Sequence, residues 1–270
     1  MIVQTANPGQ PRFIIRQIDH ARACATFARA FGNPAFAPLE PAAEVVFATA
    51  QHDSGWEPID ALPGRDPQTG LPWHLGQGPL ADRLRANAGS AALAERDNAY
   101  VGLLVSQHTW RLWGGQHDGG MVIDPDLDPG ARALVEALLR GEAARQARLL
   151  AALTGDPLLA PLASPDWRRY NDLRLRFFDR LGLYFHLTHP AARARATFDR
   201  VPRSVNDESA LTIESVGNDR YALTPWPFAG NELVFETPGR WLLPLPPDAD
   251  FAHALRYAPV DTQRAVLTAG

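Results

Sequence analysis

A change in hydrophobic periodicity near Pro190 constrains the fold of this chain more than any other feature of its sequence. Before Pro190, apolar residues recur every three or four positions, as they do on helices that bury one face. After Pro190, apolar and polar residues alternate, which is typical of strands with one buried face. We therefore expect a helical body followed by a smaller unit of strands.

The helical part divides at capping and helix-breaking residues. Asp19 is suited to begin a helix that Gly32 and Pro34 end, and Pro41 is suited to begin the next one. Helices are predicted at residues 19–31, 41–53, 80–96, 100–113, 129–153 and 167–187. Residues 57–78 contain many Pro, Gly and Asp residues and little periodicity, so we predict a long functional loop there.

Turn residues separate the alternating segments of the C-terminal part, and a short hairpin is predicted at the N-terminus. The C-terminal strands are predicted in the segments ALTIESV, RYALTPW, ELVFETP and RWLLPLP. We predict a mainly α fold with a small C-terminal antiparallel β unit, with or without the N-terminal hairpin joining it. The predicted units are the N-terminal β-hairpin at residues 1–16, the helical domain at 17–190 and the C-terminal β subdomain at 191–270.

The composition is that of a packed protein, and it disfavours several classes of function. Apolar residues make up 46% and charged residues 21% of the chain, which disfavours disorder. The 26 basic residues are all arginine and the net charge is -4, so neither lysine Schiff-base chemistry nor a broad nucleic-acid surface is expected. No signal peptide or membrane span is predicted. We expect a cytoplasmic protein with a small-molecule substrate and without a nucleic-acid or membrane partner.

Histidine and aspartate residues stand in apolar segments, where an unpaired polar group is costly. His20 lies in the first turn of the predicted helix 19–31, and the adjacent pair His52 and Asp53 ends the next helix. His108 and Asp179 lie within two further apolar helices. One buried histidine alone is more often a core residue than a ligand, so the prediction depends on the whole set. Such a set is suited to one or two divalent transition metals, with iron preferred and manganese or zinc as alternatives.

The order of a histidine, a His-Asp pair, a histidine and an aspartate on successive helices resembles the HD superfamily of metal-dependent hydrolases and oxygenases. The resemblance implies an HD-domain-like helical bundle for residues 17–190. It also implies a first metal held by His20, His52, Asp53 and Asp179. Asp53 would bridge to a second metal, and His108 would bind that second metal.

Motifs along nearly the whole chain resemble more closely a bacterial family, the domain-of-unknown-function family 3891. These motifs are the opening MIV, QIDHA at 17–21, ATAQHDSGW at 48–56, DPQTGLP at 66–72, YVGLLVSQH at 100–108, RFFDRLGLY at 176–184 and PWPF at 225–228. Two features depart from the HD pattern. The HD-x-G-Lys of the superfamily is here HDSGW, so tryptophan replaces a lysine that often meets phosphate. His74, in a loop rich in Pro and Gly, is the only histidine between His52 and His108 that could complete a two-metal site.

Other histidines and carboxylates have simpler explanations. His186 stands at the end of the last predicted helix, where a cation interacts favourably with the helix dipole. Asp172 is expected to pair with Arg176, one turn later. His117 and Asp118 form a second His-Asp pair, but the surrounding glycines favour a turn.

Three functions remain open from the sequence. Two irons would resemble the oxygenase branch of the HD superfamily, which includes inositol oxygenase, and would imply oxidation of a small organic substrate. Manganese, zinc or a magnesium-like ion would imply phosphate-ester hydrolysis by a metal-activated water, with Asp53 and Arg111 as catalytic residues. The third function is a non-catalytic metal-binding or interaction scaffold. Tryptophans near the predicted ligands and the absence of lysine favour the oxygenase narrowly.

Overall fold

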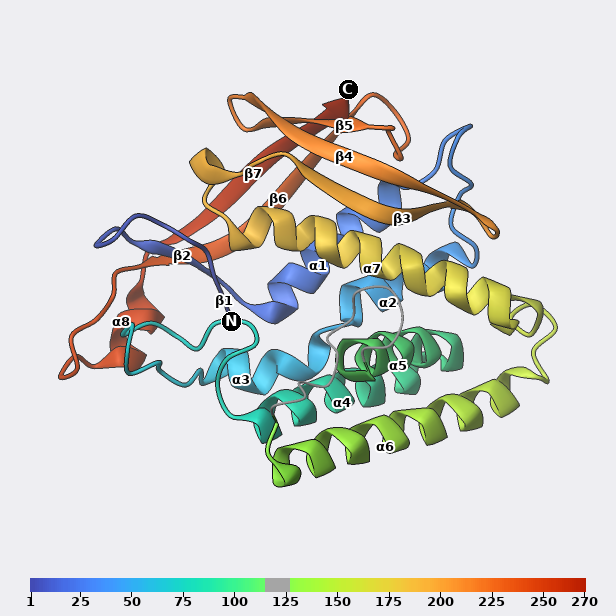
Figure 1. Ribbon diagram of the computed structural model, residues 1–270, viewed down its shortest axis with the longest axis horizontal. Helices are drawn as coiled ribbons and strands as arrows, with labels where there is room; N and C mark the ends of the chain where they lie inside the picture. Colours follow the sequence, from blue (N-terminus) through green and yellow to red (C-terminus); the bar gives the residue numbers. More distant parts are fainter. Residues whose placement is uncertain (115–126) are drawn as a thin grey trace.

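The computed structural model describes residues 1–114 and 127–270, which form helices and a large sheet stacked in layers (Figure 1). The α-helices are α1 (Gln17–Ala30), α2 (Ala42–Gln51), α3 (Glu57–Ala61), α4 (Leu80–Asp97), α5 (Ala99–Gly114), α6 (Pro129–Leu153), α7 (Pro165–Leu187) and α8 (Phe251–Tyr257). The strands are β1 (Ile2–Val3), β2 (Arg12–Ile15), β3 (Ala196–Ser204), β4 (Asp207–Gly217), β5 (Arg220–Thr224), β6 (Glu232–Leu242) and β7 (Val260–Ala269).

The described strands form one sheet, in the order β1-β2-β6-β7-β5-β4-β3. Neighbouring strands are antiparallel except β5 and β7, which are parallel. The N-terminal hairpin joins the C-terminal strands where β2 pairs with β6. Strands from both ends of the chain therefore share one sheet.

This sheet contradicts the prediction of a mainly α, HD-domain-like bundle with a small C-terminal β unit. About 49% of the structure is helical and 22% is strand. The pattern separates ELVFETP from RWLLPLP at Pro238 and Gly239, whereas β6 continues through both residues. A Cβ on Gly239 would lie 2.4 Å from Cζ of Phe13, so this glycine allows the Phe13 ring to lie close to the strand and does not mark a turn.

The helices form layers on one side of the sheet. α1 and α7 lie directly against it, and α2, α4, α5 and α6 lie beyond them (Figure 1). α7 packs against β3 and α1 packs against β6. The ring of Phe27 stacks on that of Phe235 with centroids 4.4 Å apart, which fixes α1 on β6. Because α1 and α7 are covered on two sides, polar residues on their inner faces are buried in the protein.

Local sequence signals explain where the long helices begin. The side chain of Asp128 accepts a hydrogen bond from the backbone N–H of Ala131, and Pro129 occupies the first turn of α6. Pro165 occupies the same position in α7, which starts after Ser164. None of the described helices has both the length and the apolar character needed to cross a membrane.

Candidate metal centre

Three buried side chains meet where α1, α2 and α7 pack together. His20 lies in the first turn of α1, His52 directly follows α2, and Asp179 lies in the middle of α7. One ligand atom from each of them lies within 4.8 Å of the other two. The three elements pack on one another in pairs, so the cluster is set by the helix packing.

The carboxylate of Asp179 lies between the two imidazoles. Its Oδ1 is 3.0 Å from Nε2 of His20 and 3.8 Å from Nε2 of His52. Burial by itself would raise the pKa of Asp179. The hydrogen bond to His20 and the nearby rings of His52 and His20 outweigh burial and hold this pKa well below its usual range. Asp179 is therefore an anion at neutral pH.

The orientation of His52 is fixed by the backbone. Nδ1 of His52 is 2.7 Å from the carbonyl oxygen of Thr49, and because a carbonyl can only accept, Nδ1 carries the proton and donates. In the neutral ring Nε2 then has a lone pair, which lies 3.5 Å from Oδ2 of Asp53 and 3.8 Å from Oδ1 of Asp179. Within the described residues, this buried Nε2 has no hydrogen-bond partner.

This arrangement fits a bound cation. In the neutral ring, a lone pair that faces two carboxylates in a buried site is repelled by both. A divalent metal at this point would accept electron pairs from His20, His52 and Asp179 and would neutralise the carboxylates. The donor set therefore has the chemistry of a transition-metal site.

Behind His20, a chain of hydrogen bonds leads to the sheet. Nδ1 of His20 is 2.8 Å from Nδ1 of His186, and Nε2 of His186 is 2.7 Å from Oγ1 of Thr237 on β6. Burial lowers the pKa of His186 well below its usual value, so this ring is neutral. Each of these two contacts is a hydrogen bond that needs one proton. Whether His20 carries its proton on Nδ1 or on Nε2 therefore decides which group donates in each hydrogen bond.

Asp53 and His108 lie next to the three-residue cluster. Burial raises the pKa of Asp53, even though the rings of His52 and His20 favour its anion. The ring of His108 contacts that of His52 edge-on, with centroids 5.0 Å apart. Burial and the neighbouring His52 lower the pKa of His108 to about 3, so it is a neutral imidazole at neutral pH.

Two glycines make the close packing around the cluster possible. Gly182 lies one turn after Asp179, and a Cβ on it would lie 2.4 Å from Sγ of Cys24 and 3.1 Å from Cε1 of His20. Gly55 follows the His-Asp pair, and a Cβ on it would lie 2.0 Å from the carbonyl oxygen of Ala86 on α4. The space beside His20 and the seat of the His-Asp turn on α4 therefore both require residues without a side chain.

The structure places two of the predicted site residues outside the cluster. Nδ1 of His74 accepts a hydrogen bond of 3.0 Å from the backbone N–H of Val3, so His74 fixes the N-terminal strand and lies apart from the metal centre. Arg111 forms an ion pair with the buried carboxylate of Asp172. This pair replaces the predicted pairing of Asp172 with Arg176. The predicted pair His117 and Asp118 lies outside the described residues.

Several arginines lie on α7, the helix that carries Asp179, and on the elements that pack against it. Arg176 lies one turn before Asp179, and Arg180 directly follows it with its guanidinium over the ring of Phe198 on β3. Burial, together with the like charges of Arg176, Arg200 and Arg169, lowers the pKa of Arg111 to about 10. Arg111 is paired with Asp172, and Arg169 and Arg200 are both paired with Glu208, so the charges of these three arginines are balanced within the protein.

His186 is the residue of this site that sequence reasoning explained differently. We expected a cation at the end of a helix, but burial keeps the ring neutral and it contacts His20. The signal in the sequence is its spacing, since His186 follows Asp179 by seven residues and so lies on the same face of α7. A seven-residue step from a predicted ligand is therefore a better guide than the position at the helix end.

Comparison with known proteins places the chain in a family without assigning it a reaction. No curated protein and no solved structure matches the chain. A match to a family of unknown function does not by itself place the chain in the HD superfamily. The sequence matches the family model described as "Protein of unknown function (DUF3891)" over residues 1–243, which confirms the resemblance drawn from the motifs, and the chain therefore belongs to the DUF3891 family.

Proposed function

We propose that the protein is a metal-dependent enzyme in which His20, His52 and Asp179 bind a single divalent metal. The observation that carries this proposal is Nε2 of His52, a buried lone pair that faces two carboxylates without a hydrogen-bond donor. A cation there turns the repulsion into attraction and satisfies all of the donors at once. Two imidazoles and one carboxylate form a donor set used by iron and zinc enzymes.

Oxidation of a small organic substrate with dioxygen on iron is the reaction that we favour. Iron held by two histidines and one carboxylate keeps other coordination positions open and supplies oxygen activation when it is bound. The side chains of His20 and His52 are 1% exposed, whereas that of Asp179 is 12% exposed. The substrate would therefore approach from the side of the carboxylates, and the buried imidazoles would keep water away from the other side.

The residues around the ligands would hold the site in a fixed geometry. The carbonyl of Thr49 holds the His52 ring through Nδ1 and keeps Nε2 free to bind metal. With a metal on Nε2 of His20, the proton of that ring is on Nδ1 and is donated to His186, which in turn donates to Thr237. Asp53 lies beside the ligands and is placed to accept a proton from a substrate or a water molecule.

Phosphate-ester hydrolysis is a second candidate, and the arginines beside the site favour it. Arg176 and Arg180 flank Asp179 along α7, where they could neutralise the oxygens of a phosphoryl group. Asp53 would then act as the base that removes a proton from the attacking water. Arg111 is a weaker candidate for this role than the sequence predicts, because its guanidinium pairs with Asp172.

Metal analysis of protein purified without air tests both candidates. For the oxygenase we expect iron in a ratio of about one per chain, with a ferrous centre that binds nitric oxide as a spectroscopic probe of open positions. For the hydrolase we expect manganese or zinc and turnover of bis(p-nitrophenyl) phosphate. His52→Ala should lose the metal, and the exposed His253→Gln should keep it. Protein that holds no metal after reconstitution with iron, manganese and zinc would contradict both functions.

A further inference from the structure

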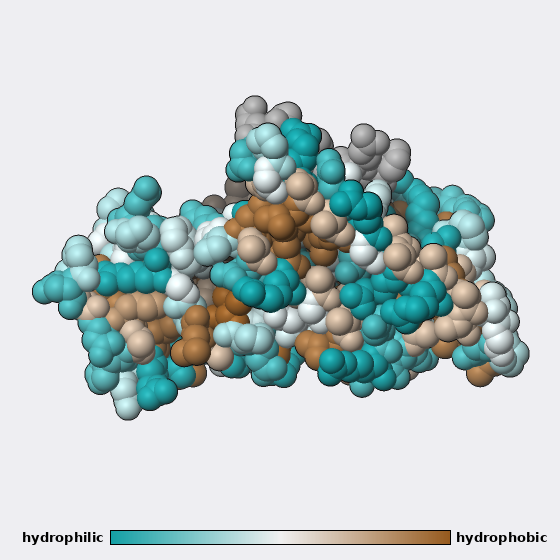
Figure 2. Space-filling model, turned by 90° about the horizontal axis from the view of Figure 1, so that it is seen from below, coloured by the Kyte–Doolittle hydropathy of each residue, from teal (hydrophilic) through white to brown (hydrophobic). Residues whose placement is uncertain are grey.

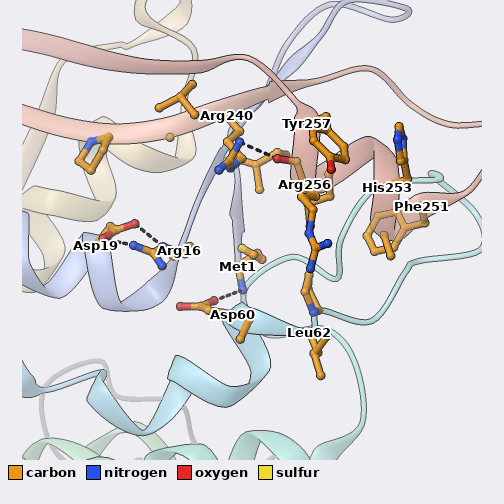
Figure 3. Close-up of a pocket in the computed structure, with 18 of the residues that line it drawn as sticks. Met1, Arg16, Asp19, Asp60, Leu62, Arg240, Phe251, His253, Arg256 and Tyr257 are labelled. Atoms are coloured by element: carbon orange, nitrogen blue, oxygen red, sulfur yellow. Dashed lines mark hydrogen bonds and ion pairs between the residues drawn. The ribbon is translucent and has the colours of Figure 1, made fainter.

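A cavity of about 800 Å³ lies apart from the metal centre, between the N-terminal hairpin, α3, β6 and α8 (Figure 3). None of the five residues predicted as metal ligands from the helices lines it. The two sites meet back to back at the first turn of α1, where Asp19 lines the cavity and His20 belongs to the metal cluster. The cavity therefore needs an explanation of its own.

The carboxylates of the cavity wall are already engaged inside the protein. Asp19 accepts hydrogen bonds from Arg16 at 2.6 and 2.9 Å. Asp60 accepts from the backbone N–H of Ile18 at 3.2 Å. Asp250 caps α8 by accepting from the backbone N–H of His253. Asp19 is therefore neutralised by Arg16 and Asp60 by the N-terminal amine of Met1, whereas the exposed Asp250 keeps its negative charge at the rim.

One cation of the cavity is not engaged. Within the described part of the chain, the guanidinium of Arg256 has no hydrogen-bond or ion-pair partner, and in Figure 3 its side chain extends across the cavity toward Leu62. The neighbouring Arg240 donates to the carbonyls of Arg256 and Ala258 at 3.1 and 2.8 Å, which fixes the end of α8 and the position of Arg256. A second positive charge therefore stands near the first.

Apolar side chains surround this charge at the mouth of the cavity. Leu62 is 85% exposed, Tyr257 68% and Val260 67%, and all three line the cavity. Brown side chains lie between teal ones at the left end of Figure 2, the end of the molecule where α8 lies in Figure 1. Exposed apolar side chains around a hollow with a few polar groups are the usual surroundings of a small-molecule site.

We propose that this cavity binds a small organic monocarboxylate, with Arg256 holding the carboxylate and the apolar body lying against Leu62, Tyr257 and Phe251. A guanidinium matches the shape of a carboxylate and can donate two parallel hydrogen bonds to it. A dianion such as a phosphate monoester is disfavoured, because the exposed carboxylate of Asp250 lines the same space. This site does not depend on the proposed metal chemistry.

Isothermal titration calorimetry with hexanoate as the probe tests the proposal, with hexylammonium and acetate as comparison ligands. Hexanoate is expected to bind one site per chain with a Kd on the order of 1 mM, the range for a ligand of this size. Hexylammonium should not bind, because its charge is of the wrong sign for Arg256. Acetate should bind at least about tenfold more weakly, because it lacks the apolar body.

Variants locate the binding in this cavity. Arg256→Gln should weaken hexanoate by about tenfold, the loss expected for one charge-assisted hydrogen bond. Arg140→Gln is the matched control, since Arg140 is an exposed arginine on α6, and it should leave the Kd unchanged. Leu62→Ser should weaken hexanoate and leave acetate unchanged, and His52→Ala should change neither.

The proposal is overturned if hexanoate does not bind at up to tens of millimolar, or if hexylammonium binds as tightly as hexanoate. It is also overturned if Arg256→Gln and Leu62→Ser both bind hexanoate as the natural protein does. Because both side chains are exposed, either variant is expected to fold, and a circular dichroism spectrum checks this.

Discussion

The metal centre and the Arg256 cavity contain similar residues in opposite conditions. Both contain histidine and aspartate, yet His20 and His52 of the metal centre are buried, whereas His253 and Arg256 of the cavity face solvent. In the metal centre, Nε2 of His52 has no partner among the described residues. In the cavity, Asp19 pairs with Arg16 and Asp250 caps α8, whereas the solvent-facing Arg256 has no side-chain partner within the described residues.

The difference shows that an unpaired group means different things in the two places. Water solvates an exposed guanidinium, so Arg256 costs the fold almost nothing and is free to bind a ligand weakly. A buried lone pair between carboxylates costs the folded state stability unless something binds there. The metal centre should therefore respond to changes in ligation and pH, whereas the cavity should tolerate substitution.

The largest effect is expected when the carboxylate of the metal centre is removed. Asp179→Ala deletes the anion between the two imidazoles, so the variant should retain no stoichiometric metal after dialysis, as measured by elemental analysis. Asp199→Ala, an exposed aspartate on β3, is the control and should keep full metal content. Full metal content in Asp179→Ala would show that the metal binds elsewhere.

Acid should destabilise the metal-free protein through its buried histidines. The pKa of His108 is lowered to about 3 in the folded state, so below the ordinary value near 6.5 the unfolded chain binds more protons than the folded one. Stability is therefore present above that value and is lost as pH falls, by at most about 1.4 kcal/mol per pH unit for one histidine.

Urea unfolding in EDTA at pH 7 and pH 5 measures this loss. His108→Gln should lose less free energy of unfolding between the two pH values than the natural protein, because one of the protons that drive the loss is gone. An equal loss in both proteins would mean that His108 does not stay neutral in the fold.

A smaller effect is expected behind the ligands. His186→Gln removes the group that holds Nδ1 of His20, and metal affinity should fall by about tenfold, the lower end of the range for such supporting residues. Chelator competition measures this affinity, and the exposed His253→Gln is the control. If His186 only fills space, His186→Phe should bind metal as tightly as the natural protein.

The smallest effect is expected at the cavity. Tyr257→Ser changes an exposed side chain on α8, so the free energy of unfolding should change by less than about 0.5 kcal/mol. Chemical denaturation measures it. A loss of several kcal/mol would show that the cavity is a structural core and would remove the contrast with the metal centre.

The sequence was a good guide to the helices and a poor one to the sheet. Helical periodicity located α1, α4, α5, α6 and α7 to within a few residues, because each buries a stripe of its own apolar residues. The strands depend on partners that are far away, such as Phe13 on β2 against Gly239 on β6. No local pattern states that β2 and β6 pair, so the sequence left open whether the hairpin joins the strands, and the prediction of a mainly α fold with only a small β unit was wrong.

The candidate site, too, was predicted from the sequence only in part. His20, His52 and Asp179 stand out in the sequence because polar residues are rare in such apolar helices, and the structure brings them together. His74 had the same residue type, but its ring accepts a hydrogen bond from Val3 on β1. The sequence could not distinguish the clustered residues from His74, because the groups that each of them contacts are far away along the chain.

The sequence by itself determined which residue types could bind a metal, which segments form the long helices and which family the chain belongs to. Only the tertiary structure decided that Thr49 orients His52, that His186 supports His20 and that Arg111 pairs with Asp172. The physical reason is that residue chemistry and helical periodicity are local properties. The direction of a lone pair and the partner of a charge depend instead on how separate helices pack.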